Sequence, residues 1–305
     1  MLHVTHVLTL VDPATPNPAL SHAVFWTERH HATLHAVHVR TPEGDSLPSA
    51  TFRYGPSEDV WDVVEPQVRR GDLASDAAAL RAGTMDAPSR AEGVLRYAQD
   101  HAIDLIVIAP QVEDKRLPVL RQYELADVIR RAPCLVLVVS GASVAFTPFQ
   151  RLLAPVDLSR RAQEELAYAK ELAALYGASL DVLHVLDRPR YVALSTTDML
   201  ALSDAKLPER TVLRRARALF DNAPGPSVDA RFHVAHGSPT QQIAAFAERH
   251  GNDLLVLASH GSTGQPQHPL GTVAAKTLRR LALPVFLVKS FGLSLVPLPS
   301  TAHQR

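Results

Sequence analysis

The chain has 305 residues, of which 46% are hydrophobic and 20% charged, so it is long enough for two globular domains with sizeable cores. Lysine plus arginine and aspartate plus glutamate both number 31, and this balance argues against nucleic acid as the main partner because no broad basic surface is required. A single cysteine excludes an intrachain disulfide, no apolar run reaches membrane-spanning length, and residues 1–4 lack a basic leader, so we expect a cytoplasmic protein without a membrane partner.

The first half of the chain alternates strand and helix patterns. In order, the predicted elements are strand 4–11, helix 18–31, strand 33–40, helix 58–70, strand 77–82, helix 89–101, strand 105–109, helix 120–131 and strand 135–139. Residues 41–55 are polar and contain proline, which predicts a connection without a regular element.

The second half shows the same alternation. In order, the predicted elements are strand 151–156, helix 161–176, strand 179–186, helix 207–222, strand 230–234, helix 240–250, strand 254–258, a helix that starts at Thr272 and ends before Pro284, and strand 285–288. Residues 187–204 form a longer connection, and Gly237-Ser238-Pro239 is predicted to turn the third strand into its helix.

Short sequence anchors recur between the halves and indicate a tandem repeat. Leu10-Val11-Asp12 recurs as Pro155-Val156-Asp157 at an offset of 145 residues. Asp104-Leu105-Ile106-Val107 recurs as Asp253-Leu254-Leu255-Val256 at an offset of 149. Two further anchors keep the same order, and the boundary between the repeats is predicted within residues 141–150.

The alternation of strands and helices predicts an α/β fold with a parallel sheet covered on both faces. Ligands of such sheets bind outside the carboxyl ends of the strands, where the strand order reverses. His184 lies in a strand that reads as buried, so it is predicted to be a core histidine with a backbone partner.

Residues 253–289 carry the pattern most relevant to function. A short apolar run, Leu254–Ala258, is typical of a strand buried on both faces, and glycines and prolines follow it. Thr272 is a favourable N-cap for the helix that comes next. A helix N-terminus attracts anions, and glycine lets the backbone approach a phosphate. The alternative is that these glycines only allow the turn between the strand and the helix and bind no phosphate.

The spacing of this loop resembles the nucleotide loop of the universal stress protein family. That motif is glycine, two residues, glycine, nine residues, glycine, and then serine or threonine. The chain matches it at Gly261, Gly271 and Thr272, after a strand that ends Leu-Ala-Ser-His. Ala258 stands where the motif has its first glycine, and Ser262 stands where a basic residue often follows the second.

The resemblance covers nearly all of both halves and implies two tandem flavodoxin-like domains of the adenine nucleotide alpha hydrolase-like kind. Each would be a five-stranded parallel sheet of order 3-2-1-4-5 with helices on both faces. Residues 1–145 would form a degenerate domain, residues 146–290 a nucleotide-binding domain, and residues 291–305 a tail.

The resemblance also implies an ATP site in the second domain, with or without Mg²⁺. Asp157, which follows Pro155 and Val156, would contact the nucleoside, and the backbone of Val185 would meet the adenine. The phosphate path would be lined by Ala258, His260, Gly261, Gly264, Gly271, Thr272 and Val273. A helix N-cap remains the alternative role for Asp157, and a plain loop position the alternative for His260.

The first half lacks the features of this site. Asp12 is present, but Leu10 replaces the proline, and no glycine lies between Gly93 and Gly141. The loop after the fourth strand instead carries Glu113-Asp114, and two carboxylates there would repel a polyphosphate. We expect this half to be a structural partner.

Neither a metal site nor a nucleophilic catalytic set is predicted. The fifteen histidines show no HExxH or Cys/His spacing, and His3 and His6 fall on opposite faces of a strand. Cys134 enters an apolar strand, and Ser159 and Ser259 lack a recognisable base and acid.

These features together predict a universal stress protein that binds ATP or a related adenine nucleotide in its second domain. We expect it to act in the stress response as a nucleotide-dependent regulator, with at most weak ATPase activity. The alternatives are a protein-interaction scaffold that binds no nucleotide and a weak adenine-nucleotide hydrolase of the same fold. Residues 135–139 and 285–288 are apolar edge strands, which favours an intramolecular pseudo-dimer of the two domains. A further homodimer is left open.

Overall fold

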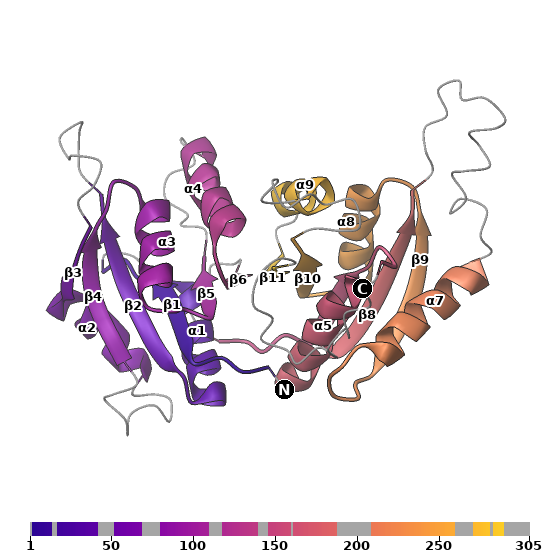
Figure 1. Ribbon diagram of the computed structural model, residues 1–305, viewed down its shortest axis with the longest axis horizontal. Helices are drawn as coiled ribbons and strands as arrows, with labels where there is room; N and C mark the ends of the chain where they lie inside the picture. Colours follow the sequence, from indigo (N-terminus) through magenta and orange to yellow (C-terminus); the bar gives the residue numbers. More distant parts are fainter. Residues whose placement is uncertain are drawn as a thin grey trace, which may run out of the picture. The chain divides into compact units, whose positions relative to one another are not determined.

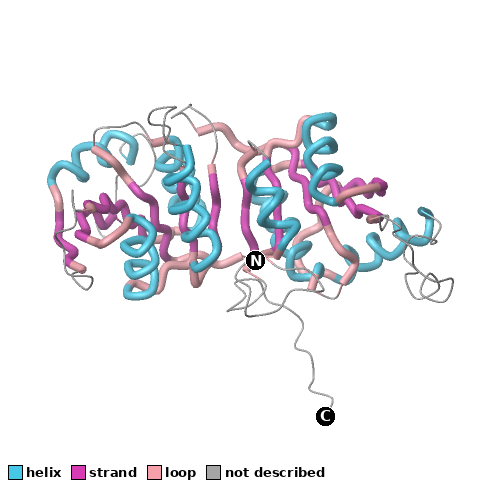
Figure 2. Tube along the Cα trace, turned by 90° about the horizontal axis from the view of Figure 1, so that it is seen from above, coloured by secondary structure: helices cyan, strands magenta, loops and turns pink. Residues whose placement is uncertain are grey.

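The computed structural model forms two compact units, His3–Thr147 and a second that joins Met1–Leu2 to Pro148–Arg305. Apart from one additional strand in the first unit, β3 at Arg53–Pro56, both units have the same order of strands and helices, as the tandem repeat predicts. Helices cover both faces of a parallel sheet in each unit (Figure 1 and Figure 2). The structure describes residues 2–13, 17–41, 52–68, 80–109, 118–139, 146–159, 161–187, 209–259, 271–280 and 283–289.

The first unit is built from strands β1 to β6 and helices α1 to α4. Its strands are β1 His6–Leu10, β2 Thr33–Arg40, β3 Arg53–Pro56, β4 Leu80–Asp86, β5 Leu105–Ile108 and β6 Leu135–Val138. Its helices are α1 Pro18–His30, α2 Glu58–Val68, α3 Arg90–Asp100 and α4 Pro118–Arg131. The sheet order is β3-β4-β2-β1-β5-β6, and all pairs are parallel except β3 with β4.

The second unit is a five-stranded, all-parallel sheet. Its strands are β7 Arg151–Pro155, β8 Ser179–Leu186, β9 Ala230–His236, β10 Leu254–Ala258 and β11 Val285–Val288. Its helices are α5 Ala162–Tyr176, α7 Glu209–Asn222, α8 Pro239–His250 and α9 Thr272–Arg280. The order β9-β8-β7-β10-β11, counted along this unit, is 3-2-1-4-5. The first unit repeats that order and adds β3 at its edge.

Two predictions for the first unit need correction. The segment 41–55 was expected to be irregular, but its end forms the antiparallel edge strand Arg53–Pro56, paired with β4. The third parallel strand spans Leu80–Asp86 instead of residues 77–82, of which 77–79 lie outside the described ranges. Both errors arise because β3 and β4 lack the continuous buried apolar run that marks a central strand.

Each sheet has one helix pair on either face. In the second unit α5 packs with α7 on one face, and α8 packs with α9 on the other, and the first unit pairs α1 with α2 and α3 with α4. Because both faces are covered, β5, β6 and β11 are buried at every position. Across the described residues, no helix combines the length and apolar character needed to cross a membrane.

The repeat extends to the turns that end the helices. His31 and Gly177 both follow the first helix of their unit in the left-handed conformation, with φ of 52° and 66°. Ala102 and Gly251 are left-handed near the end of the third helix, with φ of 48° and 64°. Glycine adopts this conformation without steric cost, so the second unit makes these turns with less backbone strain.

Candidate functional site

The strand order of the second unit reverses between β7 and β10. From β7 the chain continues to β8 on one side, whereas β10 is followed by β11 on the other. The register pairs Leu254 and Leu255 with Leu152 and Leu153, so the two strands are no longer paired where they approach their carboxyl ends. In open α/β sheets, a gap of this kind is where ligands bind.

Asp157 stands exposed just beyond β7, after the half-buried Pro155 and the buried Val156. One of its carboxylate oxygens accepts a hydrogen bond from the backbone N–H of Ser159 at 3.0 Å. The N-cap position of α5 is Arg161, which makes no side-chain capping bond, so the alternative role of Asp157 as the helix N-cap is wrong. Asp157 instead closes a small turn at the switch point.

His184 fixes the backbone next to Asp157. Its Nδ1 donates to the carbonyl of Val156 over 2.7 Å, which confirms the predicted core histidine with a backbone partner. His38 makes the equivalent bond to Val11 in the first unit, at 3.0 Å. Val185, the residue expected to meet an adenine, is the next position on β8 and is half-buried.

The end of β10 and the start of α9 lie next to each other. The N–H of Gly271 donates to the carbonyl of Ser259 at 2.7 Å, and the carbonyl of Gly271 accepts from Ala275 at 2.9 Å. Gly271 therefore occupies the N-cap position, and Thr272, predicted to be the N-cap, is the first helical residue. Glycine is tolerated at this position, and Thr272 is exposed at the helix end.

The remaining predicted residues are only partly described. Ala258 is the half-buried last residue of β10, and Val273 is 40% exposed. Three predicted phosphate-path residues lie outside the described ranges: His260, Gly261 and Gly264.

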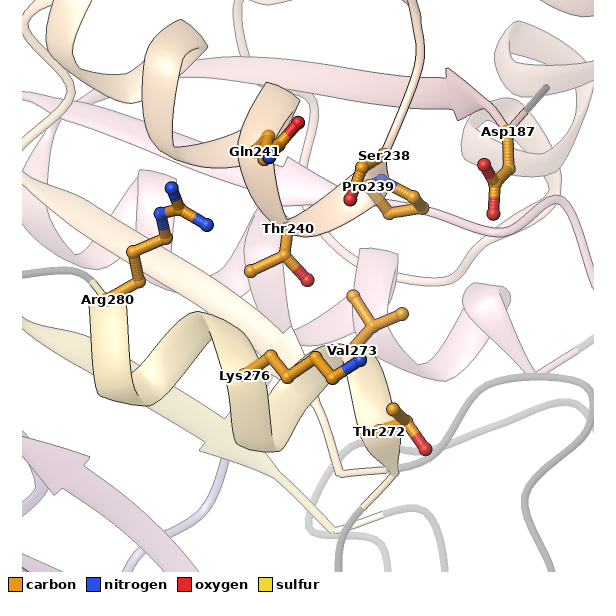
Figure 3. Close-up of a pocket in the computed structure, with 9 residues that line it drawn as sticks. All are labelled: Asp187, Ser238, Pro239, Thr240, Gln241, Thr272, Val273, Lys276 and Arg280. Carbon is orange, nitrogen blue, oxygen red and sulfur yellow. The ribbon is translucent and has the colours of Figure 1, made fainter. Parts of the chain in front are cut away.

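A pocket of about 570 Å³ opens at the carboxyl edge of this sheet, between the starts of α8 and α9. Figure 3 shows a row of side chains along it, with Arg280 at one end and Asp187, just beyond β8, at the other. Its lining residues are Asp187, Ser238, Pro239, Thr240, Gln241, Thr272, Val273, Lys276 and Arg280. The volume lies within the range of about 300–1,000 Å³ usual for small-molecule sites.

The electrostatics of this pocket favour an anion. The N-termini of α8 and α9 both border it, and each leaves N–H groups without an acceptor inside the helix. Lys276 and Arg280 add two cations from the exposed face of α9, against the one carboxylate of Asp187. Ser238, the N-cap of α8, uses no side-chain bond to cap its helix. Phosphate groups are the common ligands of such an arrangement.

Several pocket residues were missed by sequence reasoning. Ser238 and Pro239 do turn β9 into α8, as predicted, but they also line the pocket. One signal was available in the sequence: Thr272, Lys276 and Arg280 are spaced by four and share one face of a helix. The approach of α8 to α9 depends on contacts distant in the chain, so no local pattern indicates it.

Glu165 is a second residue that sequence reasoning missed. It is 4% exposed, and its Oε1 has no hydrogen-bond partner. Burial, and then the carboxylate of Asp157, raises the pKa of Glu165 well above its usual range, while a hydrogen bond from the Ala258 backbone opposes this shift. Its position in the apolar stripe of α5, with Ala162 and Leu166 beside it, was the available signal.

In the described part of the first unit, a small cavity of about 10 Å³ lies beside the ends of β1 and β2. It is lined by Leu10, Val11, Asp12, His38, Val39 and Arg90. Helix α3 approaches β2 so closely that a Cβ added to Gly93 would lie 2.7 Å from Cγ1 of Val39. In the described parts of the chain, no three His, Cys, Asp or Glu side chains gather to hold a metal ion.

The repeated strand order 3-2-1-4-5, with helices on both faces of each sheet, places the chain among tandem α/β proteins. The sequence profile of the universal stress protein family matches residues 3–140 and 148–289, one match for each repeat. The chain therefore belongs to the universal stress protein family, with two tandem domains.

Individual relatives agree with this assignment. Universal stress protein MJ0531 of Methanocaldococcus jannaschii is 25% identical over 143 residues, covering 46% of this chain and 82% of its own. Universal stress protein A homolog 1 of Coxiella burnetii is 33% identical over 118 residues, covering 38% of this chain and 80% of its own. A solved universal stress protein of Archaeoglobus fulgidus DSM 4304 is similar in fold at 17% identity, with a TM-score of 0.57 over 95% of this chain and 98% of its own.

Proposed function

We propose that the second domain binds ATP or a related adenine nucleotide and that the protein acts in the stress response as a nucleotide-dependent regulator. The observation that carries this proposal is the pocket of about 570 Å³ between the N-termini of α8 and α9, with Lys276 and Arg280 on its wall. Thr272 and Val273, which the resemblance assigns to the phosphate path, both line it. Lys276 supplies a positive charge that Ser262 in the loop does not.

The nucleoside end of the ligand is assigned to the switch point. Asp157 presents an exposed carboxylate there, and an acidic side chain in this position suits a ribose diol. The half-buried Val185 directly follows His184, whose ring is hydrogen-bonded to the carbonyl of Val156. The backbone of Val185 therefore lies on β8, the strand paired with the one that ends before Asp157. We assign no protein ligands to Mg²⁺.

The proposal further restricts binding to one site per chain. The cavity described beside Asp12 in the first domain measures about 10 Å³, and the sequence of this domain places Glu113-Asp114 after the fourth strand. We infer that this domain is a structural partner.

Calorimetric titration of the full chain with ATP tests both parts. We expect a stoichiometry near one. Asp157→Ala should weaken ATP by roughly ten- to a hundredfold, because a charge-assisted hydrogen bond contributes about 1.5–3 kcal/mol. The matched variant Asp12→Ala, at the repeat-equivalent position, should bind as the parent does. A stoichiometry near two would refute the restriction to one site. Absence of binding would instead favour the scaffold alternative.

A further inference from the structure

Glu165 holds an unusual position for a carboxyl group. It projects from the face of α5 that packs on the sheet, and 96% of its surface is removed from solvent, since only 4% remains exposed. Its Oε1 has no partner, although buried polar atoms of folded proteins nearly always have one. An ionised carboxylate in such a place is strongly disfavoured, so burial favours the protonated form of Glu165.

The surroundings of Glu165 connect it to the proposed site. The residues that act on it are Asp157, beyond the end of β7, and Ala258, whose backbone hydrogen-bonds to it from the end of β10. Ala258 lies beyond the last paired residues of β7 and β10. Because Glu165 is hydrogen-bonded to Ala258, its carboxyl group lies near the place where these two strands separate. Helix α5 also packs against β8 and α7, but no described charged group of those elements acts on Glu165.

We propose that Glu165 is a positioning residue that couples nucleotide binding to its own protonation: the site accepts the nucleotide while Glu165 is a neutral acid and binds it more weakly once Glu165 is ionised. This inference rests on the proposed function. Loss of the proton would create a poorly solvated negative charge next to Ala258, the first residue of the proposed phosphate path, and that charge would oppose the phosphates of the ligand. Adenosine carries no phosphates, so its binding should depend much less on Glu165.

The test is a titration of three proteins with ATP and with adenosine at two pH values. The proteins are the parent, Glu165→Gln, and Glu248→Gln, whose exposed glutamate lies near the far end of α8 and serves as the matched control. Suitable values are roughly pH 7.5 and roughly pH 9.5, which bracket the pKa of about 8–9 documented for glutamates buried in other proteins. Circular dichroism at both values verifies folding.

We expect the parent to bind ATP on the order of tenfold more weakly at the higher pH, with a smaller change for adenosine. Glu165→Gln keeps the size and the acceptor for Ala258 but cannot ionise, so its ATP affinity should be the same at both values. Glu248→Gln should follow the parent. A Glu165→Gln protein with the parent's pH dependence, or a parent with no pH dependence, would overturn the inference and leave nucleotide binding standing. If the parent binds no ATP at either pH, the proposed function itself fails, and this inference fails with it.

Discussion

We expect mild acid to destabilise the first domain, because two of its histidines are buried in the uncharged form. Burial lowers the pKa of His22 to about 4. Burial, and then the nearby His6, His101 and Arg81, lowers the pKa of His35 to about 3. His35 is fully buried, and its two ring nitrogens lie 3.1 Å from His6 Nδ1 and 3.0 Å from the hydroxyl of Tyr97.

The sign and size of the effect follow from proton linkage. Both folded-state pKa values lie below the ordinary 6.5, so between about pH 6.5 and about pH 4 the unfolded chain binds two protons that the folded chain does not. The stabilisation is fully present above pH 6.5 and is lost as the pH falls. Each proton changes the free energy of unfolding by about 1.4 kcal/mol per pH unit, so the pair contributes about 2.7 kcal/mol per unit. A domain of ordinary stability, about 5–15 kcal/mol, would lose a large share within two units.

The assay uses the two tryptophans, Trp26 and Trp61, because both lie in the first domain and report its unfolding within the full chain. Denaturant unfolding is followed by tryptophan fluorescence at a series of pH values. His35→Gln should reduce the slope of free energy against pH by about 1.4 kcal/mol per unit, whatever its effect on absolute stability. His3→Gln, at an exposed position, is the control and should keep the parent's slope. An unchanged slope in His35→Gln would refute the reasoning.

Three further predictions concern the pocket of the second domain and the close packing of α3 in the first domain. Gly271→Val should weaken ATP far more than adenosine, because the added side chain occupies phosphate volume; calorimetry compares the ligands, and equal losses would mean that Gly271 acts through the fold alone. Lys276→Gln should weaken ATP by at least about tenfold, from the loss of a charge-assisted contact, whereas Arg249→Gln on α8 should not. Gly93→Ala should lower the free energy of unfolding by about 1–3 kcal/mol in the tryptophan assay, since its Cβ would meet Val39; a neutral result would show that α3 moves away freely.

The elements that the sequence predicts well are those with a buried face. Leu254–Ala258 and Val285–Val288 are short apolar runs, and the structure contains both as strands with those bounds. Arg53–Pro56 was missed because it is short, mostly exposed, and contains glycine and proline. It exists through backbone pairing with β4 and through the ring of Tyr54, which lies 5.1 Å from that of Tyr97, and neither contact has a local pattern.

The candidate site divides in a similar way. Thr272 and Val273 could be chosen in advance because they follow a recognisable spacing, and both line the pocket. Ser238 was interpreted only as a turn residue, since its nearness to α9 depends on the packing of two helices. Glu165 was passed over because a charged residue in a helix usually faces solvent, and its burial is visible only once α5 lies on the sheet.

The bond between His184 and the carbonyl of Val156 provides a natural spectroscopic probe. Asp157 is attached directly to the carbonyl of Val156, so a ligand bound to Asp157 should alter the hydrogen bond between that carbonyl and His184. The ring of His184 should therefore respond to ligand binding without contacting the ligand. Its imidazole resonances in nuclear magnetic resonance spectra would then shift during a titration. His38, which makes the same bond to Val11 in the first domain, supplies an internal reference within the same molecule. The tandem repeat thus provides both the reporter, His184, and its reference, His38, without an introduced probe.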